Sequence, residues 1–426
     1  MNNSTERHDQ VIHAAKRTLH QKGRFLFNRT SVWITAVVVG FIVSNGCSLW
    51  AQADVQLKPS DLDPFFSPPP EYAGKFGAYR PLLEFYDGRP VRTQKDWQAR
   101  REEIKQVWHA ALGPWPPLLE KPVLQILDTE SLDSYTRYKV RIEIAPQGRT
   151  VDGYLLRPSG AGPFPAAIAV YYDPETGIGV GKPLRDFAKQ LALRGFVTLS
   201  IGTPESMQYY PSKENAIMQP LASLAYVAAN CHTALSQLPY VDGERIGIVG
   251  HSYGGKWAMF ASCLYDKFAC AAWSDGGIVF DEMKEDVDYW DSYYIGYEPG
   301  LPLGPRPIPD TLNPSSFITP TRRSGFGSKP ISGTVNPRTG AYQKLYESGH
   351  DLHELHALMA PRPFLVSGGE EDGVERWIPL NHSIAVNNLL GFEKRVAMTN
   401  REHHGPTPLS NSQLYAFFER FLKDTP

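Results

Sequence analysis

The sequence is poor in cysteine and carries little net charge. Four cysteines in 426 residues are too few for the dense disulfide framework of small secreted domains. A formal net charge of −2 indicates neither a basic surface for nucleic acid nor a strongly acidic one. No internal repeat of the propeller or solenoid kind is present. With 42% hydrophobic and 21% charged residues, the composition predicts one large globular domain with additions.

Long apolar runs are also scarce, and the notable one lies near the N-terminus at residues 32–43. Six Lys or Arg against two acidic residues precede residue 31, and Ala51-Gln52-Ala53 follows the apolar run. A basic segment, a short apolar segment and an A-x-A site are typical of a signal peptide. We therefore expect residues 1–53 to be cleaved after Ala53, giving a secreted or periplasmic protein without stable membrane association. An uncleaved membrane anchor is the alternative, because the basic segment is long.

Three cysteines would be left after cleavage, namely Cys231, Cys263 and Cys270. Their neighbours are apolar, which favours buried thiols that act as small hydrophobic side chains. A disulfide between Cys263 and Cys270 is the alternative.

Residues 54–122 are interpreted as an N-terminal extension that packs on the main domain. Proline, glycine and aromatic residues without a sustained period predict an extended segment up to residue 92. A helix is expected over 93–112, because Thr93 and Asp96 can form a capping box and Gly113-Pro114 ends the pattern.

Residues 123–426 are expected to form an α/β domain with a doubly wound, mostly parallel sheet. Strands at 123–127, 136–144 and 151–157 alternate in polarity, which favours an antiparallel group near a sheet edge. Further strands are predicted at 165–172, 196–201, 245–249, 268–273, 363–366 and 395–399, with helices at 184–194, 221–238 and 413–422. This alternation of strand and helix is typical of parallel sheets. An insertion at 278–350, rich in aromatic residues, is expected to shape a pocket.

The most informative motif is Gly-His-Ser-Tyr-Gly at 250–254. It follows the predicted strand at 245–249 and precedes a segment suited to a helix, as the nucleophile elbow of an α/β-hydrolase does. Gly250 and Gly254 leave room for the tight turn that would expose the Ser252 hydroxyl. The sequence therefore predicts Ser252 as a catalytic nucleophile.

A base and an acid should follow the nucleophile along the chain. His403 and His404 both stand where the base is expected, and we favour His404 because Gly405 provides a turn that would present it. Two acids fit the remaining role, since each follows a predicted strand. Asp372 lies in the usual loop and is preferred, and Asp275 is the alternative.

The oxyanion would be bound by backbone N–H groups. Tyr253, directly after the nucleophile, and Asp173, in the loop after the strand that ends at residue 172, are the predicted donors. Within the aromatic insertion, Trp290 is expected at the substrate rim. No metal or other cofactor is predicted, because the histidines at 350, 353 and 356 lack an H-E-x-x-H pattern.

Three stretches resemble the glucuronoyl esterases, a family of carbohydrate esterases with the α/β-hydrolase fold. They are G-H-S-Y-G-G-K at 250–256, D-L-H-E-L with A-P-R-P at 351–363, and E-D at 371–372 with Trp377. The resemblance implies that Ser252 is the nucleophile and His404 the base, and that Lys256 and Trp377 contact the sugar. It also favours Asp275, which stands where members carry a glutamate.

The chain departs from this family at two positions. Tyr253 replaces the arginine that helps to stabilise the oxyanion, and Trp377 lies five residues after Asp372 instead of two. The resemblance implies a polysaccharide ester as substrate, glucuronoyl or acetyl, or a small ester of that kind. A serine peptidase related to prolyl oligopeptidases and an inactive glycan-binding protein are the alternatives.

Overall fold

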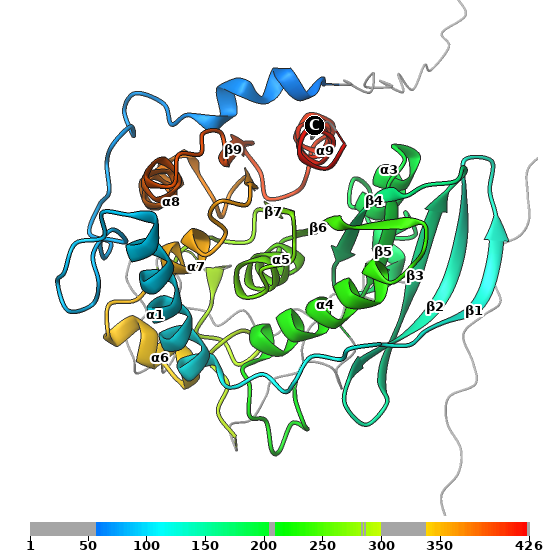
Figure 1. The fold of residues 1–426 in the computed structure, drawn as a ribbon, viewed down its shortest axis with the longest axis horizontal. Helices are drawn as coiled ribbons and strands as arrows, with labels where there is room; N and C mark the ends of the chain where they lie inside the picture. Colours follow the sequence, from blue (N-terminus) through cyan, green and yellow to red (C-terminus); the bar gives the residue numbers. More distant parts are fainter. Residues whose placement is uncertain (1–56, 204–208, 283, 285–286, 300–337, 424–426) are drawn as a thin grey trace, which may run out of the picture. The chain divides into compact units, whose positions relative to one another are not determined.

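A nine-stranded sheet runs through the part of the chain that the structure describes (Figure 1). The structure, a computed structural model, describes residues 57–203, 209–282, 284, 287–299 and 338–423. These residues belong to one compact unit, Gln52–Pro426. The predicted signal peptide and its cleavage site lie outside the described residues. No helix among the described residues is long and apolar enough to cross a membrane.

The strands follow the order β1-β2-β3-β5-β4-β6-β7-β8-β9, with β1 at one edge and β9 at the other (Figure 1). From β4 to β9 all neighbouring strands pair in parallel, whereas β1, β2 and β3 form an antiparallel group that joins the sheet through β5. The predicted α/β class and the antiparallel edge are confirmed. The strands are β1 Leu124–Ser131, β2 Tyr135–Ala145, β3 Arg149–Pro158, β4 Phe164–Val170, β5 Val197–Ile201, β6 Val241–His251, β7 Cys270–Ser274, β8 Phe364–Gly368 and β9 Val396–Asn400.

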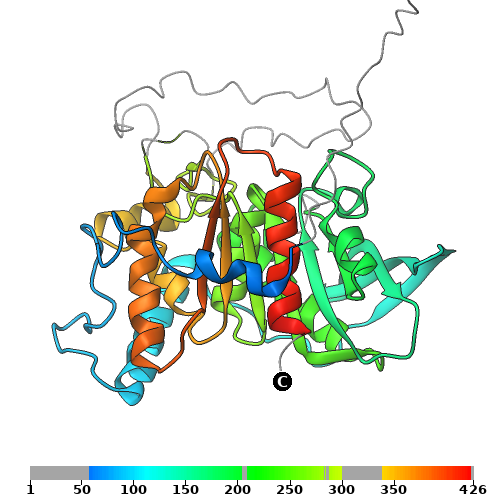
Figure 2. The same cartoon turned by 90° about the horizontal axis from the view of Figure 1, so that it is seen from above.

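Helices cover both faces of the sheet, with α5 and α9 on opposite faces (Figures 1 and 2). Neighbouring residues of β4 point to opposite faces, as a strand requires. Ile168 packs into the core beneath α1, α4 and α5, and Ala167 into the core beneath α3 and α9. The helices are α1 Gln94–Leu112, α2 Pro174–Gly177, α3 Phe187–Leu193, α4 Pro220–Ser236, α5 Tyr253–Leu264, α6 Gly340–Glu347, α7 His353–Ala357, α8 Trp377–Leu389 and α9 Pro408–Leu422, with 3-10 turns η1 Pro59–Phe66 and η4 Val374–Arg376.

The helix α1 begins and ends as its sequence predicts. The Thr93 side chain accepts a hydrogen bond from the Asp96 backbone, and Asp96 returns one to Thr93, so the capping box is complete. Gly113 ends the helix with a φ of 95°, a conformation that suits glycine.

Two helices begin three or more residues away from their predicted start. The helix expected from residue 184 begins at Phe187, because Leu184 has a φ of 62° and a side chain that is 36% exposed. The predicted start of this helix at residue 184 was therefore wrong. The last helix starts at Pro408, where Thr407 caps it through the Ser410 backbone.

Several aromatic side chains in the described parts of the predicted insertion are buried. Tyr289 is 0% exposed and Trp290 and Tyr297 are each 4% exposed. These aromatic side chains therefore add to the core beside the site, whereas residues 300–337 of the insertion lie outside the described part.

The cysteines 231, 263 and 270 are free and buried. The alternative of a Cys263–Cys270 disulfide is therefore not realised in this structure. Burial raises the pKa of all three thiols, which keeps them protonated and unreactive.

Candidate active site

Ser252 occupies a sharp turn between β6 and α5. Its φ of 58° and ψ of −119° lie in a region that non-glycine residues rarely adopt. The backbone N–H of Ser252 donates to the carbonyl oxygen of Ser274, at the end of the neighbouring strand β7, at 2.8 Å. The strained turn is thus fixed to the sheet, as expected for a nucleophile elbow.

The two motif glycines, Gly250 and Gly254, are required because no side chain fits at either position. A Cβ at Gly250 would lie 2.1 Å from the carbonyl oxygen of Gly254, and a Cβ at Gly254 would lie 2.2 Å from that of Val170. Both contacts are with backbone atoms, so no side-chain movement could relieve them. The same close approach brings the first turn of α5 against the end of β4.

His404 lies in the loop between β9 and α9 and faces Ser252. Its Nε2 is 2.9 Å from the Ser252 Oγ, and its Nδ1 is 2.7 Å from the Asp275 Oδ2. The side chain of neighbouring His403 is 81% exposed beside Glu402. The structure therefore places His404, and not His403, next to Ser252.

Asp275 follows β7 and is fully buried. Its second oxygen, Oδ1, accepts hydrogen bonds from the backbone N–H groups of Glu371 at 3.2 Å and Asp372 at 3.0 Å. Burial alone would raise the pKa of this carboxyl, but the hydrogen bond and charge of His404 outweigh burial and hold the pKa below its ordinary value. An ionised Asp275 can fix the tautomer of the imidazole and stabilise the imidazolium.

Asp372, which the sequence favoured as the acid, turns its carboxylate elsewhere. It accepts hydrogen bonds from the backbone N–H groups of Gly277 at 2.9 Å and Ile278 at 2.7 Å. Burial and the nearby Asp275 carboxylate raise the pKa of Asp372. The expected order of the two acids is thus reversed in space: Asp275 reaches His404, whereas Asp372 braces the turn that follows Asp275.

Arg401 holds the histidine loop, a contact that sequence reasoning missed. Its guanidinium donates to the carbonyl oxygens of His404 at 2.7 Å, Gly405 at 2.8 Å and Ser367 at 2.7 Å. An arginine three residues before His404 belongs to no recognisable motif. Only the folded loop shows that Arg401 holds it in place. Arg401 therefore ties the His404 loop to the end of β8.

His251 packs against His404, a contact that sequence reasoning also missed. The ring centroids of His251 and His404 are 4.7 Å apart, and His251 Nδ1 is 3.1 Å from the Ser274 carbonyl oxygen. Burial and the neighbouring His404 hold the pKa of His251 well below its ordinary value. His251 is thus a neutral, buried ring that packs against the His404 imidazole.

The predicted oxyanion donors lie at the start of α5 and after β4. Tyr253 is the first residue of α5, where backbone N–H groups lack partners within the helix. Its ring stacks on that of Tyr172, with centroids 5.1 Å apart and planes 10° apart. Asp173 follows Tyr172, and its side chain caps α2 by accepting from the Thr176 N–H at 2.7 Å. Both predicted donors therefore stand in segments that the Tyr172–Tyr253 stack brings together.

The three predicted substrate contacts are buried. Lys256 is 3% exposed, and its Nζ donates to the Gly276 carbonyl oxygen at 2.6 Å. Trp290 is 4% exposed and packs edge-on against Tyr342, and Trp377 is 2% exposed. Trp290 and Trp377 pack in the hydrophobic core, so the rim position expected for Trp290 and the sugar contacts expected for Lys256 and Trp377 stay predictions.

The histidines at 350, 353 and 356 have separate surroundings. His350 Nδ1 lies 2.9 Å from a Glu354 oxygen, and His353 Nε2 lies 2.9 Å from the carbonyl oxygen of Arg80. His356 is buried and its ring lies 5.3 Å from that of Trp273. No cluster with metal-ligand geometry occurs among the described residues.

The sequence profile of the prolyl oligopeptidase family matches residues 228–300, which include the elbow. A 4-O-methyl-glucuronoyl methylesterase of Neurospora crassa is 28% identical over 199 residues, or 45% of this chain and 47% of that protein. The match thus spans about half the length of this curated relative.

Solved glucuronoyl esterases share the fold over most of the chain. The enzyme of Solibacter usitatus has a TM-score of 0.59 at 18% identity, and the match covers 80% of this chain and 97% of that one. The enzyme of Caldicellulosiruptor kristjansonii has a TM-score of 0.55 at 18% identity, with 83% and 92% covered. For the enzyme of Teredinibacter turnerae the TM-score is 0.54 at 19% identity, with 80% and 89% covered.

These similarities agree with the resemblance seen in the sequence motifs and with the elbow geometry. The chain has the α/β-hydrolase fold and is similar to the glucuronoyl esterases.

Proposed function

We propose that this chain is an exported serine esterase that cleaves an ester group on a polysaccharide. The observation that carries the proposal is the continuous line of hydrogen bonds from the Ser252 Oγ through His404 to Asp275, with distances of 2.9 and 2.7 Å. Ser252 is the nucleophile, His404 the general base and Asp275 the acid of the triad. Asp372 acts through Asp275, as a positioning residue.

Each step follows from the position of a side chain. The Ser252 Oγ attacks the ester carbonyl carbon while its proton passes to His404 Nε2, and Asp275 stabilises the imidazolium. The tetrahedral oxyanion accepts hydrogen bonds from the backbone N–H of Tyr253 and from the loop at Asp173. His404 then protonates the leaving alcohol, and a water molecule activated by His404 releases the acid from Ser252.

The substrate class rests on similarity. The named relative is a 4-O-methyl-glucuronoyl methylesterase, and the structural neighbours are glucuronoyl esterases, which supports a glucuronoyl ester on a polysaccharide. Tyr253 stands where these enzymes are expected to carry an arginine, and its ring is 2% exposed. A buried aromatic ring offers no positive charge to the oxyanion. The proposed substrate class therefore includes acetyl esters as well as glucuronoyl esters.

Replacing Ser252 with alanine tests the proposal. We expect kcat/KM for 4-nitrophenyl acetate and for methyl glucuronate to fall by roughly 10⁴-fold or more, because no other group can form the acyl-enzyme. The matched control is Ser131→Ala on the exposed edge strand β1, which should behave as the parent. Equal turnover by Ser252→Ala and the parent would contradict the esterase assignment.

A peptidase is the second candidate, because the prolyl oligopeptidase profile matches the elbow segment. A chromogenic peptide with proline before the scissile bond should be cleaved no faster than background if the esterase proposal is correct. Rapid cleavage of this peptide, together with no release of acid from acetylated xylan or methyl glucuronate, would transfer the assignment to a peptidase.

Export is the remaining part of the proposal. Its support is the basic segment followed by the apolar run and Ala51-Gln52-Ala53. Mass spectrometry of the protein recovered from the culture medium or periplasm should give Asp54 as the first residue. A chain that stays in the membrane fraction with its N-terminus intact would support the anchor alternative.

A further inference from the structure

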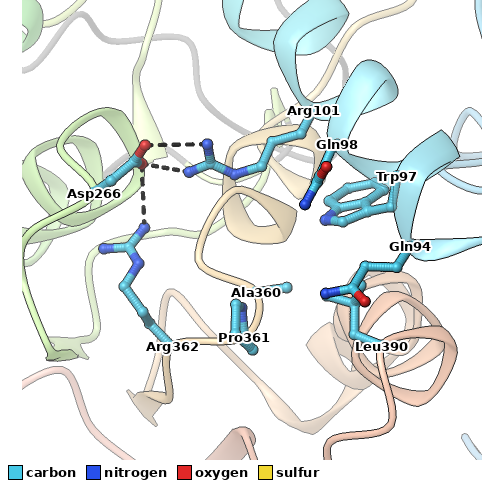
Figure 3. Close-up of a pocket in the computed structure, with 9 residues that line it drawn as sticks. All are labelled: Gln94, Trp97, Gln98, Arg101, Asp266, Ala360, Pro361, Arg362 and Leu390. Carbon is cyan, nitrogen blue, oxygen red and sulfur yellow. Dashed lines mark hydrogen bonds and ion pairs between the residues drawn. The ribbon is translucent and has the colours of Figure 1, made fainter.

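A pocket with a volume of about 300 Å³, lined by both polar and apolar side chains, lies beside the first turns of α1. The helix contributes Gln94, Trp97, Gln98 and Arg101 to one side of it. Asp266 and Arg362 stand on the other side, and Ala360 and Pro361 lie between (Figure 3). The volume is at the lower end of the range for small-ligand sites, which is roughly 300 to 1,000 Å³.

The pocket is at the opposite end of the sheet from Ser252. Asp266 comes before β7 and Arg362 before β8, whereas Asp275 and Asp372 follow the same two strands. Each of these strands is 5 residues long, which corresponds to about 16 Å of extended chain. A molecule in this pocket therefore cannot touch the reacting atoms.

The positive charges in the pocket already have partners. Arg362 donates to the carbonyl oxygens of Ser262 at 2.9 Å and Phe268 at 3.0 Å. Arg101 donates to both oxygens of the Asp266 carboxylate, and its Nη1 is 3.1 Å from Oδ2. These guanidinium groups line the pocket, but their donors are already engaged and do not form an anion-binding site.

The uncommitted donors are neutral. Trp97 is 2% exposed, and its indole Nε1 is buried without a hydrogen-bond partner among the described residues. Such an N–H is unfavourable unless a ligand or water supplies an acceptor. Gln94 and Gln98 line the pocket next to it with exposed amides, and the Asp266 side chain, 46% exposed, has lone pairs to spare.

We infer that this pocket binds a neutral sugar unit of the polysaccharide, at a second site separate from the catalytic one. Sugar hydroxyls both donate and accept, so they can satisfy the Trp97 N–H and the glutamine amides and also donate to Asp266. The C–H face of the ring can pack on Pro361 and Leu390, which line the same pocket. Naming a polysaccharide as the ligand rests on the proposed function.

A second site of this kind would hold the polymeric substrate close to the enzyme between catalytic events. Binding of one sugar unit raises the effective concentration of ester groups elsewhere on the same chain. The pocket should therefore lower KM for a polymer and leave the hydrolysis of a small ester unchanged.

The test uses the indole N–H signal of Trp97 in the NMR spectrum of the full chain, assigned by its loss in Trp97→Phe. Xylohexaose should shift this signal in a saturable way, and Trp97→Phe should weaken xylohexaose binding by about tenfold, because one buried hydrogen bond is lost. The matched control is Trp115→Phe, since the Nε1 of Trp115 is likewise buried without a partner among the described residues but lies outside the pocket. This control should bind as the parent does.

A second variant guards against a folding defect. Gln98→Ala changes an exposed side chain of the pocket and should also weaken binding, whereas Gln343→Ala on α6 should not. If the Trp97 signal does not respond to xylohexaose, or if Trp97→Phe and Gln98→Ala both bind as the parent does, the inference is wrong. A response to glucuronic acid but not to xylohexaose would also overturn it, since the ligand would then be an anion.

The outcome can be separated from that of the proposed function. Binding is measured with an unesterified oligosaccharide, so it does not depend on catalysis. If xylohexaose binds but no ester is cleaved, the result supports the sugar site and contradicts the esterase proposal. If 4-nitrophenyl acetate is cleaved but xylohexaose does not bind, the result supports the esterase proposal and contradicts the sugar site.

Discussion

Asp275 and Asp372 are chemically alike, buried and close together, yet they have different partners. Asp275 accepts from His404, and Asp372 accepts from two backbone N–H groups of the turn after Asp275. The Asp372 N–H in turn donates to Asp275 at 3.0 Å. In the proposed mechanism the Asp275 carboxylate stabilises the His404 imidazolium, and the Asp372 carboxylate fixes the position of Asp275.

Exchanging each acid for its amide should separate these roles. Asp275→Asn should lower kcat for 4-nitrophenyl acetate by about 10⁴-fold, because an amide can hold the wrong imidazole tautomer and cannot stabilise the imidazolium. Asp372→Asn should lower it by about 10- to 100-fold, since the amide NH₂ opposes one backbone N–H and displaces the turn. The measurement is kcat across a pH series. A larger loss for Asp372→Asn than for Asp275→Asn would reverse the assignment.

At the scale of secondary-structure elements, the junction between β6 and α5 carries the site. Its sequence predicts both the strand-turn-helix and the nucleophile, because glycine is required wherever two backbones approach as closely as they do here. Elements without such local signals are harder to predict. The helix α8, Trp377–Leu389, lacks a side-chain cap at its start and was not predicted.

Gly254→Ala should destroy the junction. The new Cβ would lie 2.2 Å from the Val170 carbonyl oxygen, so α5 or β4 must move and the Ser252 turn with it. We expect at least a 10²-fold loss of kcat/KM, measured with 4-nitrophenyl acetate. Gly243→Ala in β6, the strand before the turn, is the control, because its new Cβ meets nothing closer than the Ser236 Cβ at 3.2 Å. Full activity of Gly254→Ala would show that the elbow tolerates a side chain.

At the scale of the whole molecule, a buried carboxyl group links distant segments of the chain. Asp351 accepts from the backbone N–H groups of Phe280 at 2.9 Å and Leu352 at 2.6 Å, which joins the loop after β7 to the start of α7. Burial raises the pKa of Asp351 to about 7. This carboxyl is therefore protonated in the folded protein at a pH where it is ionised in the unfolded chain.

Stability should consequently depend on pH through Asp351. Between about pH 4 and 7 the folded state keeps a proton that the unfolded state has lost, so this group makes folding less favourable as the pH rises. Asp351→Asn retains an acceptor oxygen without the charge. Relative to the parent, it should gain stability from pH 5 to pH 8, by a few kcal/mol at most, as measured by urea unfolding. Exposed Asp133→Asn is the control, and a parallel pH dependence for Asp351→Asn and the parent would contradict the prediction.

The sequence by itself determined the alternation of strands and helices, the capped helix α1, the elbow at Ser252 and the choice of His404 next to Gly405. These features depend on backbone conformation and on neighbours within a few residues. Only the tertiary structure decided which carboxylate meets His404, because the backbone N–H groups that orient Asp275 come from residues 371 and 372. It also decided that Lys256, Trp290 and Trp377 are buried, since the direction of a side chain depends on what the rest of the chain packs against it.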